Sequence, residues 1–425
     1  MDAIEIRPIA EDEFPTAVRL MGVAFAEEWT EDDVKAYQAS FPFERSLCAF
    51  ENGKMVATSA VLSLELTLPG HVSVPMGGVT WIGTLPTHRR RGLLRRLMLA
   101  QAADMMERGE TISGLGASEG NIYGRFGYGP ATHFASFRLE RARARFSSPV
   151  DDASAGRITL LDTDEAAAQL PAIFDGLRLR QPGMVRRSAG LWQEYFGDPT
   201  PNREGAGRMF HCMHETTPGR PDGYVSYRVK EEWSGETPAY EVRVVELVAA
   251  DLGTYRALWD YIIDTDLAAT ITCWRGRVDE PLRWQLADLR QFKVEAVADF
   301  LWLRLLDVPR ALAARAYSCP GELVLDVTES FPVPRRVRYA LRADGTGADA
   351  FQGGSAGASG VECTVTKATP DLALAVETLA SAYLGGVSFA TLAAAGRVQE
   401  LRAGAIAQAD AMFHTGAAPY SFIEF

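Results

Sequence analysis

The sequence predicts an α/β protein with mixed sheets, divided into several domains. Its 425 residues exceed the roughly 100–200 residues of an ordinary single domain. Strand-like and helix-like patterns alternate through residues 1–140, and breaks in composition separate this part from two later segments. Apolar residues make up 47% of the chain and charged residues 23%, which is typical of a globular protein.

The first segment, residues 1–142, is predicted to be a sheet accompanied by three helices. Two β-rich runs flank Asn52-Gly53, a dipeptide typical of a two-residue hairpin turn. Apolar residues recur at core spacing in the last of the helices. The expected elements are a strand over Ile4–Ile9, helices over Glu13–Ala26 and Asp32–Ala39, strands over Ser46–Glu51, Met55–Leu68 and Val72–Thr84, a helix over Arg91–Arg108, and a strand over Thr111–Ala117.

The second and third segments are predicted over residues 143–300 and 301–425. A basic and then Ser/Pro/Asp/Gly-rich stretch at Arg141–Arg157 indicates the first linker. In the second segment we expect strands over Gly223–Lys230 and Tyr240–Ala249 and a helix over Leu252–Asp264. In the third we expect strands over Glu322–Val327 and Arg336–Leu341, an exposed loop over 344–360, and helices over Asp371–Ala382 and Arg397–Met412. The apolar chain end, Tyr420–Phe425, is expected to be docked rather than frayed.

The second segment contains a faint repeat of the first. Val79–Pro86 and the helix after it resemble Val245–Gly253 and the helix over Tyr255–Ile263. Both stretches have the order strand, short turn, helix, but the second has no arginine cluster where its helix begins. We therefore expect the second segment to repeat the shape of the first without its anion site.

Composition and cysteine usage exclude several classes of protein. A net charge of −12 disfavours binding to nucleic acid. No apolar run reaches the roughly 20 residues of a membrane span, and the acidic N-terminus is unlike a signal peptide. The five cysteines are far apart with no CxxC motif, which favours a reducing, cytoplasmic compartment over a disulfide framework or a zinc site. We expect no bound metal.

The charges are unevenly distributed. Residues 1–33 contain ten acidic and two basic residues, whereas residues 88–96 contain five arginines and no acid. This pattern suits a protein that binds a cationic substrate and an anionic cofactor. The alternative is a solvated acidic face beside a helix terminus.

The arginine cluster begins a predicted helix directly after a strand. Free backbone N–H groups in the first turn of a helix bind phosphate, and arginine adds charge-assisted donors. Arg89, Arg90 and Arg91 would supply those donors, while Gly92 lets a pyrophosphate approach the backbone. The stretch is neither a Walker loop nor a Rossmann fingerprint. A basic helix face on the surface is the alternative.

These motifs resemble those of a known family. Arg89-Arg-Arg-Gly-Leu-Leu94 after a strand is similar to the acetyl-CoA signature of the GNAT superfamily of N-acetyltransferases, with Leu94 where most members have Gly or Ala. Together with Ala117-Ser-Glu-Gly-Asn-Ile-Tyr-Gly-Arg-Phe-Gly-Tyr-Gly-Pro-Ala131 and the chain end Ile423-Glu424-Phe425, it resembles the Eis (enhanced intracellular survival) family of actinobacterial N-acetyltransferases. The resemblance extends over the whole chain, although the middle segment matches by length and pattern alone.

The resemblance implies a fold, a cofactor and an assembly. It implies a catalytic GNAT domain, a second GNAT-like domain without the cofactor motif, and a sterol-carrier-protein-like C-terminal domain, assembled as a homohexamer. Acetyl-CoA would be the co-substrate of amine acetylation, including acetylation of aminoglycosides. Three sets of cofactor residues are implied. Ile82, Gly83 and Thr84 would pair with the pantetheine arm, and Ser118 and Glu119 would line the far side of the cofactor. The residues implied for the pyrophosphate are Arg89, Arg90, Arg91, Gly92, Leu93, Leu94 and Arg95.

The resemblance also assigns catalytic and acceptor residues. Tyr123 lies in a glycine-rich loop that can approach a ligand closely, and the family uses this tyrosine as the general acid that protonates the leaving thiolate. The α-carboxylate of Phe425 would serve as the base. A loop tyrosine packed with one hydrogen bond is the alternative, for which Tyr128 is the control. The implied acceptor residues are Phe25, Glu27, Tyr37 and Glu424.

Two functions remain open from the sequence. The first is an acetyl-CoA-dependent N-acetyltransferase that acts on primary amines of a polycationic acceptor, such as an aminoglycoside, a polyamine or lysine side chains. The second is a non-catalytic protein that retains a CoA site and binds an apolar ligand or acts as a scaffold.

Overall fold

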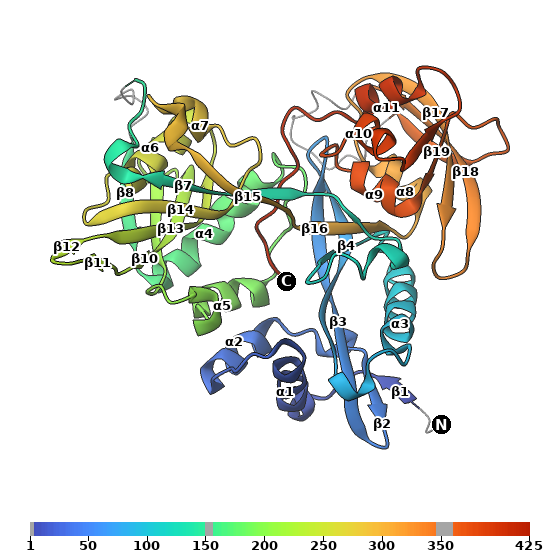
Figure 1. Cartoon of the computed structure of the whole chain (residues 1–425), viewed down its shortest axis with the longest axis horizontal. Coiled ribbons are helices and arrows are strands. Elements are labelled where there is room, and N and C mark those ends of the chain that lie inside the picture. The colour runs from blue at the N-terminus through green and yellow to red at the C-terminus, as the bar shows by residue number, and fades with distance from the viewer. Residues whose placement is uncertain (1–3, 149–155, 346–359) are drawn as a thin grey trace. The chain divides into compact units, whose positions relative to one another are not determined.

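The chain folds into two compact units, each assembled from separate stretches of sequence (Figure 1). The computed structural model describes residues 4–148, 156–345 and 360–425. Unit 1 comprises Met1–Thr132, Leu179–Ser188 and Asp299–Phe425, and unit 2 comprises His133–Arg178 and Ala189–Ala298. The predicted boundaries after residues 142 and 300 stay predictions. No helix in the described part of the chain combines the length and apolar character needed to span a bilayer.

A seven-stranded mixed sheet forms the first layer of unit 1. Its strand order is β1-β2-β3-β4-β5-β16-β6, and its pairs are antiparallel except for β4 and β5, which run parallel. The strands are β1 Ile4–Arg7, β2 Cys48–Glu51, β3 Lys54–Leu68, β4 Val72–Thr84, β5 Ile112–Gly116, β6 Gly129–Pro130 and β16 Leu301–Leu305; the accompanying helices are α1 Phe14–Phe25, α2 Glu31–Ser40 and α3 Leu93–Glu107.

Local sequence accounts for most of this layer. Thr30 caps α2 by accepting from the backbone N–H of Asp33, whose carboxylate accepts from the N–H of Thr30 in return. The buried side of α3 carries Leu93, Leu97 and Met98, which confirms the apolar spacing predicted for this helix. The expected hairpin and the strand over Val72–Thr84 are also confirmed.

A five-stranded sheet with four helices forms the remainder of unit 1. Its strand order is β19-β18-β17-β20-β21. The strands are β17 Pro320–Glu329, β18 Arg335–Asp344, β19 Val361–Val365, β20 Leu372–Ala375 and β21 Val398–Glu400; the helices are α8 Val308–Ala314, α9 Val376–Ala382, α10 Phe389–Ala394 and α11 Ala405–Phe413.

Unit 2 contains a second seven-stranded sheet, of order β15-β7-β14-β13-β10-β9-β8, in which β13 and β14 run parallel. The strands are β7 His133–Glu140, β8 Arg157–Leu161, β9 Phe210–Glu215, β10 Gly223–Lys230, β13 Tyr240–Ala249, β14 Ala268–Gly276 and β15 Lys293–Asp299, with a small pair β11 Trp233–Ser234 and β12 Thr237–Pro238. The helices are α4 Thr163–Arg178, α5 Ala189–Gly197, α6 Leu252–Ile263 and α7 Leu282–Gln285. The expected β10, β13 and α6 are confirmed.

Short 3-10 helices connect several of these elements in both units. They are η1 Glu11–Glu13, η2 Phe43–Arg45, η3 Pro86–His88, η4 Gly124–Phe126, η5 Arg141–Arg143, η6 Thr200–Arg203 and η7 Leu289–Gln291.

Three sequence expectations were wrong or incomplete, each because of long-range strand pairing. Leu372–Ala375 is strand β20 rather than the start of a helix, since it pairs with both β17 and β21 and buries Leu372 and Leu374. Val398–Glu400 likewise pairs as β21, and α11 begins after Gly404. The third segment was expected to begin at residue 301, and Leu301 begins strand β16, which joins the first sheet between β5 and β6. The loop expected over 344–360 falls largely on residues 346–359, outside the described residues.

A fully buried arginine links the helices of the C-terminal part of unit 1. The Arg315 guanidinium donates to the carbonyl oxygens of Ala316, Tyr383 and Phe413, and the last two stand at the C-terminal ends of α9 and α11. Terminal helix carbonyls lack partners within the helix and carry partial negative charge. Arg315 therefore satisfies two helix ends at once.

We predict that Arg315→Met destabilises the protein. Hydrogen bonds to a charged group contribute about 1.5–3 kcal/mol each, so loss of these donors should lower the free energy of unfolding by about 3 kcal/mol or more. Urea unfolding followed by intrinsic fluorescence measures the change. Arg310→Met, on the exposed side of α8, is the matched control and should change stability by at most about 0.5 kcal/mol. Equal stability of the two variants would contradict this role of Arg315.

Candidate active site

Strands β4 and β5 begin side by side and then part. Their parallel pairing covers Met76, Gly77 and Gly78 of β4, opposite Ile112, Ser113 and Gly114 of β5. Strand β4 continues to Thr84, whereas β5 ends at Gly116. Beyond Gly78, the edge of β4 that faces β5 has no ladder with β5 in the described part of the chain. Its peptide groups are therefore available to an extended ligand that carries amide groups.

A β-bulge lies in β4 beyond this point. Thr80 pairs with Ala60 and Gly83 with Thr58, so Trp81 and Ile82 stand opposite the single residue Ser59. Trp81 has φ +54°, in the left-handed region that non-glycine residues rarely adopt. Bulges bend a strand and redirect its side chains and peptide groups. The predicted pantetheine residues Ile82, Gly83 and Thr84 include the second bulge residue and the two that follow it.

Gly83 is needed for packing as well. A Cβ at this position would stand 2.6 Å from the sulfur of Met21 on α1, closer than real Cβ atoms approach. Glycine thus allows α1 to lie close to the bulge.

Helix α3 begins with its first-turn amides uncapped by a side chain. Gly92 is the N-cap residue, with φ +77°, and nothing lies within 4 Å of the position where a side chain would begin. Arg90 also has positive φ, at +62°. The corresponding helix of unit 2, α6, begins differently, because the Asp251 carboxylate accepts from the N–H of Thr254 at 2.9 Å. An anion can therefore approach α3, whereas a carboxylate already holds the same position at α6.

The five arginines around this turn are not equivalent. Arg91 and His88 both contact the Glu51 carboxylate, and the hydrogen bond from Arg91, helped by His88, lowers the pKa of Glu51 to about 2. Three of the other arginines donate to backbone carbonyl oxygens: Arg89 to that of Ala24 at 3.4 Å, Arg95 to that of Pro332 at 3.1 Å and Arg96 to that of Ile4 at 2.8 Å. For Arg90 no partner is present among the described residues. Sequence reasoning missed Glu51, which lies 40 positions from Arg91.

The tyrosine loop follows β5. Tyr123 is 5% exposed, and burial, with smaller effects from Tyr128 and Glu119, raises its pKa to about 12. Tyr123 therefore carries its proton at neutral pH, and no hydrogen-bond partner of its hydroxyl is present in the described part of the chain. Tyr128 instead shares a 2.6 Å hydrogen bond with Ser113, as expected of the control residue. Ser118 and Glu119 are exposed at the start of the loop.

The chain end is docked, as expected. Phe422 and Ile423 are buried, and Tyr420 donates its N–H to the carbonyl of Pro182 at 2.8 Å. The Phe425 ring lies 3.0 Å from the point where a side chain would begin at Gly78. Gly78 is the last β4 residue that pairs with β5, so the Phe425 ring lies where the two strands part.

Part of the predicted acceptor site is assembled around an aromatic cluster. The rings of Trp29, Tyr37 and Trp81 are 5.0–6.2 Å apart, and the Glu27 carboxylate accepts from the Trp29 indole N–H at 3.2 Å. Glu27 and Tyr37 are thereby linked through Trp29. Aromatic faces beside a carboxylate attract cations.

The other two predicted acceptor residues are exposed. Phe25 is 42% exposed at the end of α1, outside this cluster, and Glu424 is also exposed. Sequence reasoning missed Trp29 and Trp81. The tryptophan before Ile82 was visible in the β4 motif, but its positive φ was not.

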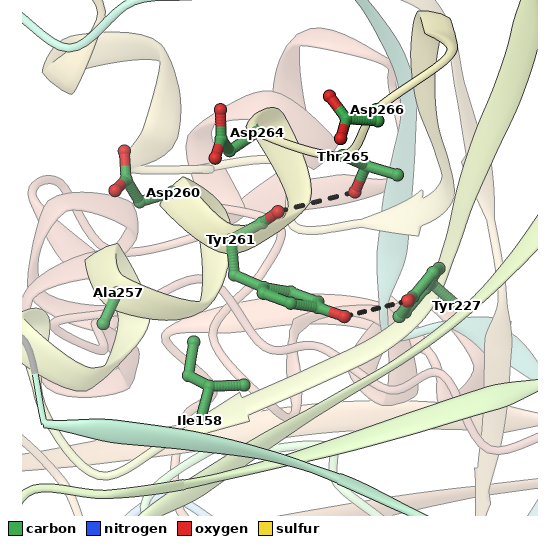
Figure 2. Close-up of a pocket in the computed structure, with 8 residues that line it drawn as sticks. All are labelled: Ile158, Tyr227, Ala257, Asp260, Tyr261, Asp264, Thr265 and Asp266. Carbon is green, nitrogen blue, oxygen red and sulfur yellow. Dashed lines mark hydrogen bonds between the residues drawn. The ribbon is translucent and has the colours of Figure 1, made fainter.

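A cavity lies within unit 2, and none of the predicted site residues is among the residues that line it (Figure 2). Its volume is about 420 Å³, and its two tyrosine hydroxyls share a 3.0 Å hydrogen bond. Arg141 stands 3.8 Å from two of its acidic residues, Asp264 and Asp266. The lining residues are Ile158, Tyr227, Ala257, Asp260, Tyr261, Asp264, Thr265 and Asp266.

Comparison with known proteins adds independent evidence. The family model described as an acetyltransferase (GNAT) domain matches residues 5–131, a second model of the same description matches 183–305, and a sterol carrier protein domain matches 308–421. An uncharacterized N-acetyltransferase of Streptomyces avermitilis is 36% identical over 99% of this chain and 98% of that protein. N-acetyltransferase Eis of Mycobacterium tuberculosis is 30% identical over 98% of each chain.

Solved structures agree with these matches. The crystal structure of Eis1 from Mycobacterium abscessus superimposes with a TM-score of 0.84 at 32% identity and covers 100% of both chains. A GCN5-related N-acetyltransferase from Anabaena variabilis, at 17% identity, has a TM-score of 0.82 over 100% of both chains and shows the shared fold.

Proposed function

Since the chain belongs to the Eis family of GNAT N-acetyltransferases, we propose that it transfers the acetyl group of acetyl-CoA directly to a primary amine of a polycationic acceptor. Aminoglycosides, polyamines and lysine side chains are the acceptor classes that fit. That the protein is an N-acetyltransferase with two GNAT domains and a sterol-carrier-like domain is shown by the relatives and family matches. The residue roles below and the choice of acceptor are our proposal.

One observation supports the proposed site above all others: the Phe425 ring lies against Gly78, where β4 and β5 part. In this proposal Ile82, Gly83 and Thr84 pair their backbone with the pantetheine amides. The open N-terminus of α3, with Arg89–Arg95, binds the pyrophosphate, and Ser118 and Glu119 line the far side. The chain end then lies near the thioester.

The chemistry needs one proton donor and one group that receives the amine. The neutral amine nitrogen attacks the thioester carbonyl carbon, the carbon–sulfur bond breaks, and Tyr123 gives its hydroxyl proton to the departing sulfur. The acylated nitrogen then loses one proton, which returns to the tyrosinate and restores Tyr123. The Phe425 carboxylate orients the incoming ammonium and takes up its proton through water. A raised pKa keeps Tyr123 protonated before the step, which fits a donor rather than a base.

The acceptor class rests on charge and aromatic contacts. Glu27 and the rings of Trp29, Tyr37 and Trp81 together suit an ammonium group. The ten acids of residues 1–33 would attract a polycation over longer distance. Phe25 and Glu424 complete the proposed acceptor surface. A second candidate function, binding of an apolar ligand without turnover, is favoured by the sterol carrier match alone.

We further propose that the protein is a cytoplasmic homohexamer. All five cysteines are free thiols, as suits a reducing compartment. Unit 2 exposes Trp274 to 57% and Trp284 to 71%, side chains that contacts between subunits would cover.

We predict that replacing Arg90 and Arg91 together with Ala weakens CoA binding. Each charge-assisted contact contributes about 1.5–3 kcal/mol, so the apparent KM for acetyl-CoA should rise about tenfold or more. Loss of Arg91 also leaves the Glu51 carboxylate without that partner, near the incoming anion. Arg108→Ala, at the other end of α3, removes a like charge and should change CoA affinity little. Unchanged affinity of the double variant by calorimetry would place the CoA site elsewhere.

We predict that the position of the Phe425 carboxylate determines turnover. Deleting Phe425 moves the terminal carboxylate back by about 3.3–3.6 Å of chain, and a misplacement of about 1 Å can cost about 100-fold. A short Gly-Ser tail keeps the ring but converts the carboxylate to an amide. Both changes should lower kcat severely, whereas Phe425→Leu, which keeps the carboxylate and much of the apolar volume, should cost little.

Thermal melting checks that all three variants are folded. A tailed protein that melts normally and turns over at the wild-type rate would refute the carboxylate role and leave Phe425 as a packing residue.

A further inference from the structure

Strand β16 places two large side chains beneath the tyrosine loop. It lies between β5 and β6, and the loop that carries Tyr123 runs from the end of β5 to the start of β6. Trp302 and Arg304 are two residues apart in this strand and so share one face of the sheet. A Cβ atom added at Gly120 would lie 3.7 Å from the Trp302 ring, and one added at Gly127 would lie 3.6 Å from Arg304 Nε. The two residues contact opposite ends of the loop.

Arg304 is a buried cation that contacts no carboxylate in the described part of the chain, although Glu329 acts on it electrostatically. It is 5% exposed, and its Nη2 donates to the carbonyl of Phe331 at 3.3 Å. No ion pair of Arg304 is present in the described part of the chain, whereas Arg45, also buried, contacts both Glu110 and Asp104. A charge that no counter-ion neutralises at contact distance, in surroundings of low dielectric constant, acts strongly on nearby groups.

Phe331 lies in contact with both Arg304 and the tyrosine loop. Its ring is 1% exposed and lies under the Arg304 guanidinium at 4.8 Å and under that of Arg95 at 5.1 Å. On the loop, the Phe126 ring meets it edge to face at 5.1 Å. Phe126 in turn donates its N–H to the carbonyl of Tyr123 at 2.9 Å. A chain of direct contacts therefore leads from Arg304 through Phe331 and Phe126 to the backbone of Tyr123.

We propose that Arg304 is a positioning residue for acetyl transfer, which holds the Tyr123 loop through Phe331 and Gly127. This proposal rests on the proposed role of Tyr123 as proton donor. A side chain that holds a donor within a fraction of an ångström of its target affects the chemical step more than the binding of substrate. The family resemblance and the comparisons assign no role to Arg304.

The test measures kcat and KM separately in the full-length protein. Arg304→Met should lower kcat by about 10- to 100-fold while the KM for acetyl-CoA stays within about threefold, since uniform binding is retained. Arg304→Lys keeps the charge and should recover much of the lost kcat. Arg315→Met, at a buried arginine that contacts no acidic side chain among the described residues, should lower stability without lowering kcat of the folded protein.

A double-mutant cycle with Tyr123→Phe tests whether Arg304 acts through the loop. If it does, Arg304→Met should have little further effect once the Tyr123 hydroxyl is gone, because coupled residues are not additive. Wild-type kcat in folded Arg304→Met, or losses that multiply in the double variant, would overturn the proposal.

Two further arms keep the outcomes distinct. Wild-type kcat in Tyr123→Phe alone would overturn the general-acid role itself, so the two failures can be told apart. If Arg304→Met does not fold, Phe331→Leu removes the connecting ring but keeps the carbonyl, and it should lower kcat; since the same ring also lies under Arg95, kcat rather than KM is the readout for this variant. Wild-type kcat in Phe331→Leu would then overturn the proposal.

Discussion

The parting of β4 from β5 is the constraint on which the site depends. Two parallel strands that pair at three positions and then separate leave one edge of β4 without a ladder to β5. The bulge at Trp81 and Ile82 follows on β4, and the turn after β4 leads into α3. The Phe425 ring lies at the last paired residue of β4, Gly78. The bulge, the turn into α3 and the Phe425 ring are thus all reached from β4 at or beyond the point where it parts from β5.

The helices α3 and α6 differ in what caps their first turn. Gly92 begins α3 with no side chain over the first turn, and arginines surround it. Asp251 is the N-cap residue of α6, and its carboxylate oxygen accepts a hydrogen bond from the backbone N–H of Thr254. The aspartate stabilises the helix by about 0.5–2 kcal/mol but brings negative charge to the place where a phosphate would bind. This difference supports the prediction that the second segment repeats the shape of the first without its anion site.

Much of the fold was predictable because it follows local rules. Periodicity gave β3, β4, α3 and β13, and the Asn52-Gly53 turn marked the first hairpin. Strands β16 and β20 were not predictable as sheet members, because their partners lie far away in sequence. A single sequence does not encode that pairing in any local signal.

The candidate site, like the fold, was predictable where local sequence motifs mark it and not where distant elements contribute. The anion turn and the tyrosine loop were visible as motifs. The contacts that surround them were not, because Glu51, Trp29, Arg304 and Phe331 reach the site from other elements. The left-handed backbone of Trp81 likewise depends on pairing with β3 rather than on residue type.

In the proposed function, this protein transfers the acetyl group of acetyl-CoA to a cationic amine and does not merely bind acetyl-CoA. The most direct measurement is the rate of thiol release from acetyl-CoA by the full-length protein with polyamines, aminoglycosides and lysine peptides, compared with neutral hydrophobic amines. We predict amine-dependent thiol release that is fastest with polycations and that slows as added salt screens the acidic surface. Saturable CoA binding by calorimetry, with no amine raising thiol release above the amine-free rate, would contradict it.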